Sequence, residues 1–125
     1  MNWSATGAAA LGLAVILGAF GAHGLKDRLD AYSASVYEKA VFYHFIHALG
    51  LLIVPLLLKA GYLSPTQVTW VCSFLLAGIL LFSGSLYVLA VTRVPALGIV
   101  TPLGGLSFIA AWLMLAWTLL RNGPK

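Results

Sequence analysis

Long uncharged runs separated by short polar connections dominate the pattern of the chain. Four such runs occupy residues 3–23, 37–59, 67–91 and 96–120, and the only charged residues in them, Glu38, Lys39 and Lys59, lie at the ends of the second run. Each is about 20 residues or longer, which as a helix crosses a hydrocarbon layer of about 30 Å. Only helices and closed barrels satisfy their backbone in lipid, and short connections make consecutive helices antiparallel. The pattern therefore predicts an all-α integral membrane protein. Residues 1–125 are expected to form a single domain, in which four transmembrane helices pack as an antiparallel bundle.

The first connection, residues 25–36, has a pattern of its own. It holds the only dense group of charges, Lys26, Asp27, Arg28 and Asp30. Apolar side chains recur opposite these charges with helical spacing, at Leu25, Leu29, Tyr32 and Val36. This spacing predicts a short interfacial helix between the first two spans, with a disordered loop as the alternative. Ser35 and Glu38 then form a capping-box sequence that predicts the start of the second span.

Small residues and proline add detail to the first and fourth spans. Gly7, Ala14, Gly18 and Gly21 fall on one helical stripe of the first span. In lipid, small residues let helix backbones approach closely, so this stripe is a candidate packing face. In the fourth span, Pro102 lacks a backbone donor and disfavours helix at Thr101. We expect a kink over 101–105, with a freed carbonyl that faces protein or water.

Composition identifies lipid as the solvent of this chain. Its 125 residues are 62% hydrophobic and only 8% charged, whereas a soluble domain has roughly a quarter charged residues. The mean hydropathy is +1.01. The net charge of +4 is scattered, so no basic run suggests a nucleic-acid partner. The single cysteine, Cys72, excludes an intramolecular disulfide and a cysteine metal cluster. The lipid bilayer is the partner that the composition predicts.

Candidate chemistry centres on two histidines in the second span, His44 and His47. His47 lies roughly 14 Å along the helix from Glu38, near the middle of the bilayer. A polar ring at that depth needs a partner, so we expect His47 to point inward and bond to another helix. The available partners are hydroxyl groups in the third and fourth spans, at Ser83, Ser85, Tyr87 and Thr101, and the last three are the expected ones. His44 is expected to lie to one side of this inward stripe.

The roles open to these rings are a packed bridge between helices, a proton or solute path, or a metal or haem site. A metal site needs three or four ligands. The only other histidine, His23, ends the first span, and no HExxH or CxxC motif is present. The sequence therefore assigns no cofactor and no metal. No serine has a visible base and acid, so nothing in the sequence favours an enzyme.

Four sequence blocks resemble a known family. They are GAFGAHGL at Gly18–Leu25, YHFIHALGLL at Tyr43–Leu52, FSGSLYVLA at Phe82–Ala90 and TPLGG at Thr101–Gly105. With these blocks the chain resembles domain of unknown function 423, which includes the animal proteins similar to transmembrane protein 256. The resemblance implies a small multi-pass protein, in the bacterial plasma membrane, and no activity. It also implies that the family pattern includes His23, His47, Ser85, Tyr87, Thr101 and Pro102.

Two classes of function stay open at this point. The first is a small oligomeric transport or permeation protein with polar groups around His47, and the sequence leans to it. The alternative is an accessory or scaffold subunit that packs on a larger membrane complex. A haem- or metal-binding membrane protein is third. A wet polar cavity that reaches His47 would favour the first class. A dry bundle with a small-residue face toward lipid would favour the second.

Overall fold

The computed structural model describes residues 1–122, and most of them are helical. The elements are α1 (Trp3–His23), α2 (Ala31–Lys59), α3 (Pro65–Gly78), the π-helix η1 (Ile79–Ser83), α4 (Gly84–Thr92), the 3₁₀ helix η2 (Pro95–Ile99) and α5 (Thr101–Arg121). They form four spans that are each long and apolar enough to cross a membrane. The predicted all-α fold with four transmembrane helices is confirmed.

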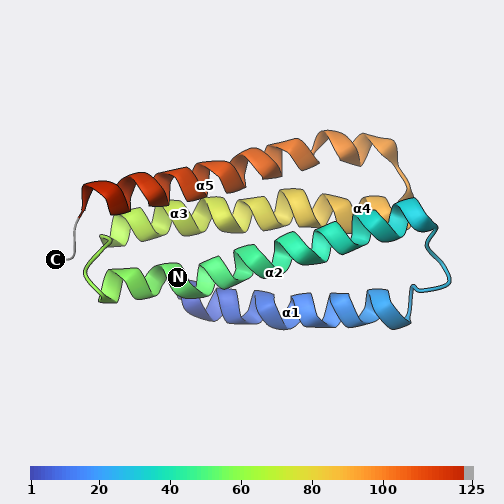
Figure 1. Cartoon of the computed structure of the whole chain (residues 1–125), viewed down its shortest axis with the longest axis horizontal. Helices are drawn as coiled ribbons and strands as arrows, with labels where there is room; N and C mark the ends of the chain where they lie inside the picture. Colours follow the sequence, from blue (N-terminus) through green and yellow to red (C-terminus); the bar gives the residue numbers. More distant parts are fainter. Residues whose placement is uncertain (123–125) are drawn as a thin grey trace.

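The four spans lie side by side in chain order (Figure 1). The third span, which consists of α3, η1 and α4, packs between α2 and α5. α1 packs mainly against α2 and forms the outer edge of the row. Consecutive spans are antiparallel, so the two termini lie toward the same end of the molecule (Figure 1). This arrangement leaves α1 with much more surface for lipid than α2 has.

Small residues bring α1 close to α2, as their stripe predicts. A Cβ atom added to Gly7 would lie 2.5 Å from the backbone nitrogen of Leu52. At the other end of α1, a Cβ atom on Gly21 would lie 2.3 Å from the ring of Tyr37. Ala14, between them, is fully buried. The stripe is therefore a packing face, and its glycines set how closely the two backbones approach.

The first connection differs from the prediction, because residues 25–36 do not form a separate interfacial helix. Residues 24–30 form turns, and α2 begins at Ala31. Its N-cap is Asp30, whose carboxylate accepts a hydrogen bond from the Ser33 amide at 2.7 Å. The predicted capping box is also wrong, since Ser35 and Glu38 both lie inside α2. Aspartate caps a helix as well as serine does, and the earlier cap adds turns to the same apolar helix.

The interruption of the fourth span lies earlier than predicted. Residues 101–105 form the regular first turns of α5, and the break falls at Val100, between η2 and α5. Pro102 causes no kink, because the first turn of a helix needs no backbone donor there. The Leu97 carbonyl accepts bonds from the Val100 amide at 3.1 Å and the Thr101 hydroxyl at 3.4 Å. The carbonyl at the break is thus satisfied by protein groups.

Candidate functional site

His44 makes the interhelical hydrogen bond that the sequence assigned to His47. Its ring is 2% exposed, and its Nδ1 lies 2.9 Å from the Tyr87 hydroxyl, so the pair joins α2 to α4. Which atom donates depends on the tautomer of the ring. The Tyr87 ring in turn meets the Tyr37 ring edge-on at 5.2 Å. His44 therefore lies on a different side of α2 from His47, and this side is the contact with α4.

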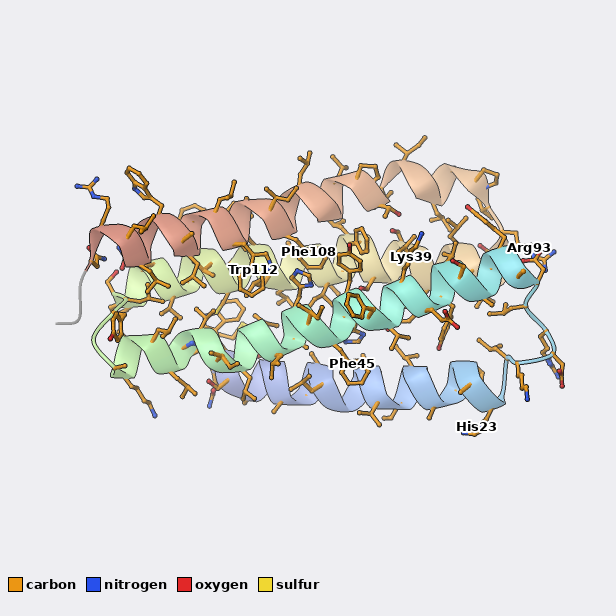
Figure 2. All side chains as sticks on the ribbon, in the orientation of Figure 1. His23, Lys39, Phe45, Arg93, Phe108 and Trp112 are labelled. Carbon is orange, nitrogen blue, oxygen red and sulfur yellow. The ribbon has the colours of Figure 1, made fainter. Side chains whose placement is uncertain are left out.

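His47 points into the bundle as expected, with 4% of its surface exposed, but it does not bond to another helix. Its Nδ1 donates to the carbonyl of Tyr43, one turn back on α2, at 2.7 Å. Its ring stacks on Phe108 of α5 with 3.5 Å between centroids, and Trp112 lies 5.7 Å away. Figure 2 shows Phe108 and Trp112 between α5 and α2. Aromatic packing thus replaces the expected polar partner.

Hydroxyl groups provide most of the remaining interhelical hydrogen bonds. Ser85 and Thr101 bond to each other at 2.6 Å, which joins α4 to α5. Ser83 donates to the Ala40 carbonyl of α2 at 2.8 Å. Ser4, Tyr37 and Ser107 each donate to a backbone carbonyl of the neighbouring span. The His44–Tyr87 pair is the sixth interhelical bond. Each pair of neighbouring spans is therefore joined by two such bonds.

The sequence did not identify three of these residues: Ser4, Tyr37 and Ser107. Ser107 donates to the Phe74 carbonyl, which belongs to another span. A serine in a helix more often bonds to its own preceding turn, and spacing alone does not separate the two cases. Tyr37 was expected at the very start of the second span, whereas the structure places it in the second turn of α2, beside α1. Its hydroxyl donates to the Leu17 carbonyl of α1.

Ser83 and Ser85 face different spans because residues two positions apart along a helix point in nearly opposite directions. The π-helix η1 lies at the same place. A π turn holds one residue more than an α turn, so the residues after it are rotated about the helix axis. Ser83, its last residue, faces α2, whereas Ser85 faces α5. Close packing against α5 accompanies this turn, since a Cβ atom on Gly104 would lie 2.3 Å from the Phe82 nitrogen. The third span can therefore bond to both of its neighbours.

The predicted site residues do not converge on one centre. His44 with Tyr87, His47 with Phe108, and Ser85 with Thr101 are separate contacts. Pro102 is exposed in the first turn of α5. His23 is exposed at the end of α1 (Figure 2). Within residues 1–122, no three His, Cys, Asp or Glu side chains are placed to hold a metal ion.

The polar groups buried around these residues are paired within the protein. In the part of the chain that the structure describes, every buried side-chain nitrogen or oxygen has a hydrogen-bond partner. One groove of about 360 Å³ lies between α1 and α2, beside the first connection. Another of about 550 Å³ lies at the opposite end, beside Met1 and Lys59. Neither groove is lined by His44 or His47. The arrangement is suited to holding helices together.

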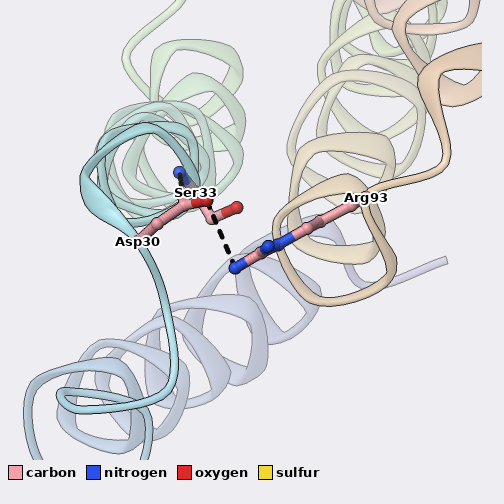
Figure 3. Close-up of polar contacts among 3 residues, drawn as sticks. All are labelled: Asp30, Ser33 and Arg93. Atoms are coloured by element: carbon pink, nitrogen blue, oxygen red, sulfur yellow. Dashed lines mark hydrogen bonds and ion pairs between the residues drawn. The ribbon is translucent and has the colours of Figure 1, made fainter.

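An ion pair joins two connections at one end of the molecule. Arg93, which ends α4 in the left-handed conformation with φ 58°, places its guanidinium 3.2 Å from the Asp30 carboxylate. Figure 3 shows this contact beside the Ser33 amide. The hydrogen bond from the Ser33 amide is the main reason that the pKa of Asp30 lies below its ordinary value, and Arg93 adds to this effect. The pair is half exposed, so its own contribution to stability is small.

Comparison with known proteins identifies the family. Residues 17–105 match the family described as protein of unknown function DUF423. A UPF0382 membrane protein of Staphylococcus saprophyticus is 49% identical over 106 residues, which cover 82% of this chain and 83% of the relative. A UPF0382 membrane protein of Bacillus subtilis is 49% identical over 105 residues, with 82% and 83% coverage. One from Staphylococcus epidermidis is 48% identical over 109 residues, with 87% coverage of both chains.

No solved structure matches the chain significantly. The matched segment runs from the second half of α1 to the first turns of α5, and it includes both buried histidines and the Ser85–Thr101 pair. The relatives are named as membrane proteins, in agreement with the four candidate spans. The chain therefore belongs to the DUF423 family, whose bacterial members similar to it carry the name UPF0382 membrane protein.

Proposed function

We propose that this protein is an accessory subunit that packs against another membrane protein through the outer face of α1. The proposal rests on the exposure of α1, since the other helices of this chain cover little of its surface. Of its 21 residues, only Gly7 and Ala14 are buried. The opposite face holds small exposed residues on one stripe: Ala5, Ala8, Gly12 and Ala19. We call these four residues the outer stripe.

The outer stripe has no role in the packing of this chain. A Cβ atom on Gly12 would meet nothing within 4 Å, in contrast to one on Gly7. Glycine in a helix interior costs about 1 kcal/mol relative to alanine, so its presence at position 12 is not explained by stability. In a bilayer, small residues stabilise helix association because they allow close backbone contact. A second helix against the outer stripe accounts for both features.

The contacts of His47 support an accessory role over permeation. The permeation hypothesis depends on polar groups around His47, and that ring is stacked on Phe108 and bonded to its own helix. A path for protons or solutes needs water or unpaired polar groups, which the grooves at either end do not bring to His47. We place the protein in the plasma membrane, because the relatives are bacterial membrane proteins.

Photo-crosslinking in living cells tests the accessory role. A photoreactive phenylalanine analogue at Gly12 should give an adduct with a different protein, because the outer stripe faces the partner. The same analogue at Ala116, an exposed alanine of α5, is the matched control and should give lipid adducts only. Identical lipid adducts at both positions would contradict the proposal. An adduct of twice the chain mass at Gly12 would show a homo-oligomer and also contradict it.

Flux measurements separate this role from permeation. Purified protein in liposomes that contain a pH-sensitive dye should carry no protons above the level of empty liposomes. His47→Gln serves as the comparison, since glutamine keeps a polar side chain at this position. A proton flux in the parent that is lost in His47→Gln would make permeation the better explanation.

A further inference from the structure

We propose that the groove between α1 and α2 binds one phospholipid with a zwitterionic, primary-ammonium headgroup. In this site an acyl chain lies in the groove, the phosphate contacts Lys26 and the ammonium contacts Glu38. Both charged residues line the groove, together with apolar side chains of both helices. This proposal does not depend on the accessory role, since the groove and the outer stripe are separate surfaces.

The size and lining of the groove fit part of a lipid chain. Its volume is about 360 Å³, within the range of about 300–1,000 Å³ of small-molecule pockets. Its walls are mainly aliphatic and aromatic, and include Leu25, Val41 and Phe45. On the α1 side the lining residues Gly18, Gly21 and Ala22 are small, so they leave space in the groove for a chain. An acyl chain can therefore lie against the groove without meeting an unpaired polar group in its apolar part.

The groove has the orientation of a lipid in the bilayer. One end lies at the turns that join α1 to α2, where Lys26 and Leu29 contribute to the lining. From Glu38 the groove continues to Phe45, about 10 Å along α2 toward the middle of the membrane. The charged end thus meets the headgroup region, and the apolar end meets the hydrocarbon.

The two charges at this end select a headgroup. Among residues 1–122 the one ion pair joins Arg93 to Asp30, so Lys26 and Glu38 keep their charges available. Lys26 offers three donors to a phosphate, and the Glu38 carboxylate accepts bonds from a primary ammonium. A purely anionic headgroup would place negative charge beside Glu38. A trimethylated ammonium has no N–H group to donate to that carboxylate.

Native mass spectrometry with defined lipids tests the proposal. The purified protein is mixed with equal amounts of phosphatidylethanolamine, phosphatidylglycerol and phosphatidylcholine that share the same acyl chains. We expect one phosphatidylethanolamine to stay bound in preference to the other two lipids. Because each charge-assisted bond is lost separately, Lys26→Gln and Glu38→Gln should each weaken this retention by about tenfold. Lys39→Gln and Asp27→Asn are matched controls outside the groove and should leave it unchanged.

A groove-filling variant provides an independent measurement. Ala34→Phe adds a ring to the lining and should remove the bound lipid, whereas Ala19→Phe, exposed on α1 outside the lining, should not. Equal retention of the three lipids, unaffected by the charge variants, would show adventitious lipid only and overturn the proposal. The proposal would also be overturned if Ala34→Phe abolished the protein adduct at Gly12 but left lipid retention unchanged. That result would mean that a partner protein occupies the groove.

Discussion

At the scale of single residues, the buried polar groups of this protein act as ties between neighbouring helices. His44 and Tyr87 form one such tie at 2.9 Å, and Ser83 with the Ala40 carbonyl forms another at 2.8 Å. Lipid supplies no hydrophobic drive between helices, so hydrogen bonds and close packing must stabilise the contacts. Each such hydrogen bond contributes about 1 kcal/mol to helix association in a bilayer. Together the bonds stabilise the three contacts between neighbouring spans.

The His44–Tyr87 tie can be tested by removing one hydroxyl. Tyr87→Phe keeps the ring against Tyr37 but leaves His44 Nδ1 without its partner. We expect the free energy of unfolding to fall by about 1 kcal/mol, because an unpaired buried nitrogen costs more than the bond alone contributes. Unfolding by sodium dodecyl sulfate in mixed micelles measures the change. Tyr43→Phe is the control, since the structure gives the Tyr43 hydroxyl no bond, and an equal loss there would contradict the interpretation.

At the scale of elements, two glycines of α1 lie on faces with different surroundings, because Gly7 packs against α2 and Gly12 faces open space. Gly7→Ala should weaken the α1–α2 contact by about 1–3 kcal/mol, because its Cβ meets backbone that cannot move aside. Gly12→Ala should be neutral or stabilising by up to about 1 kcal/mol, since the added carbon meets open space and alanine favours the helix. The same detergent unfolding measures both variants. A loss of stability in Gly12→Ala that equals the loss in Gly7→Ala would contradict the assignment of the faces.

The start of α2 should respond to acid. The Ser33 amide favours the ionised form of Asp30 and holds its pKa below the ordinary value of 3.8. A depressed pKa stabilises the folded form above pH 3.8, and this stabilisation is lost as the pH falls through the lowered value. A spin label at Ala31, in a Cys72→Ser background, should therefore become mobile below pH 3.8.

Two variants control for other acid effects on this label. In Asp30→Ala the label should already be mobile at neutral pH and should respond little to acid, because the cap is absent. In Asp27→Asn the response should match the parent, because Asp27 caps no helix in the structure. A label that stays immobile in Asp30→Ala would show that Asp30 does not determine where α2 begins.

At the scale of the whole molecule, the row of four antiparallel spans predicts the topology in the membrane. Cysteines at Asn2 and Asn122 should react with an impermeant maleimide from the same side, and a cysteine at Asp27 from the opposite side. The native Cys72 is fully buried, so it should stay unlabelled in the folded protein. Labelling of intact cells and of opened membranes, compared by mass shift, measures this. Opposite-side labelling of positions 2 and 122 would require an odd number of spans.

The sequence determined the features that depend on the solvent of the chain. Uncharged runs that match the bilayer thickness were sufficient to predict four helices, since backbone groups in lipid must bond within their own segment. The inward position of His47 followed from the same cost of an unpaired polar group in hydrocarbon. The packing role of Gly7 and Gly21 was predictable, because small residues on one stripe are what close helix contacts need.

Only the tertiary structure decided which polar groups meet. Helical spacing places His44 and His47 on neighbouring faces but does not say which span each face meets, and the π-helix η1 changes the phase of the third span. The bond therefore formed at His44, while His47 stacked on Phe108. The start of α2 at Ala31, after the Asp30 cap, and the break at Val100 were also decided by competing caps and turns, whose energies differ by only about 1 kcal/mol. Such small differences are resolved by the packing of neighbouring helices, which a single sequence does not display.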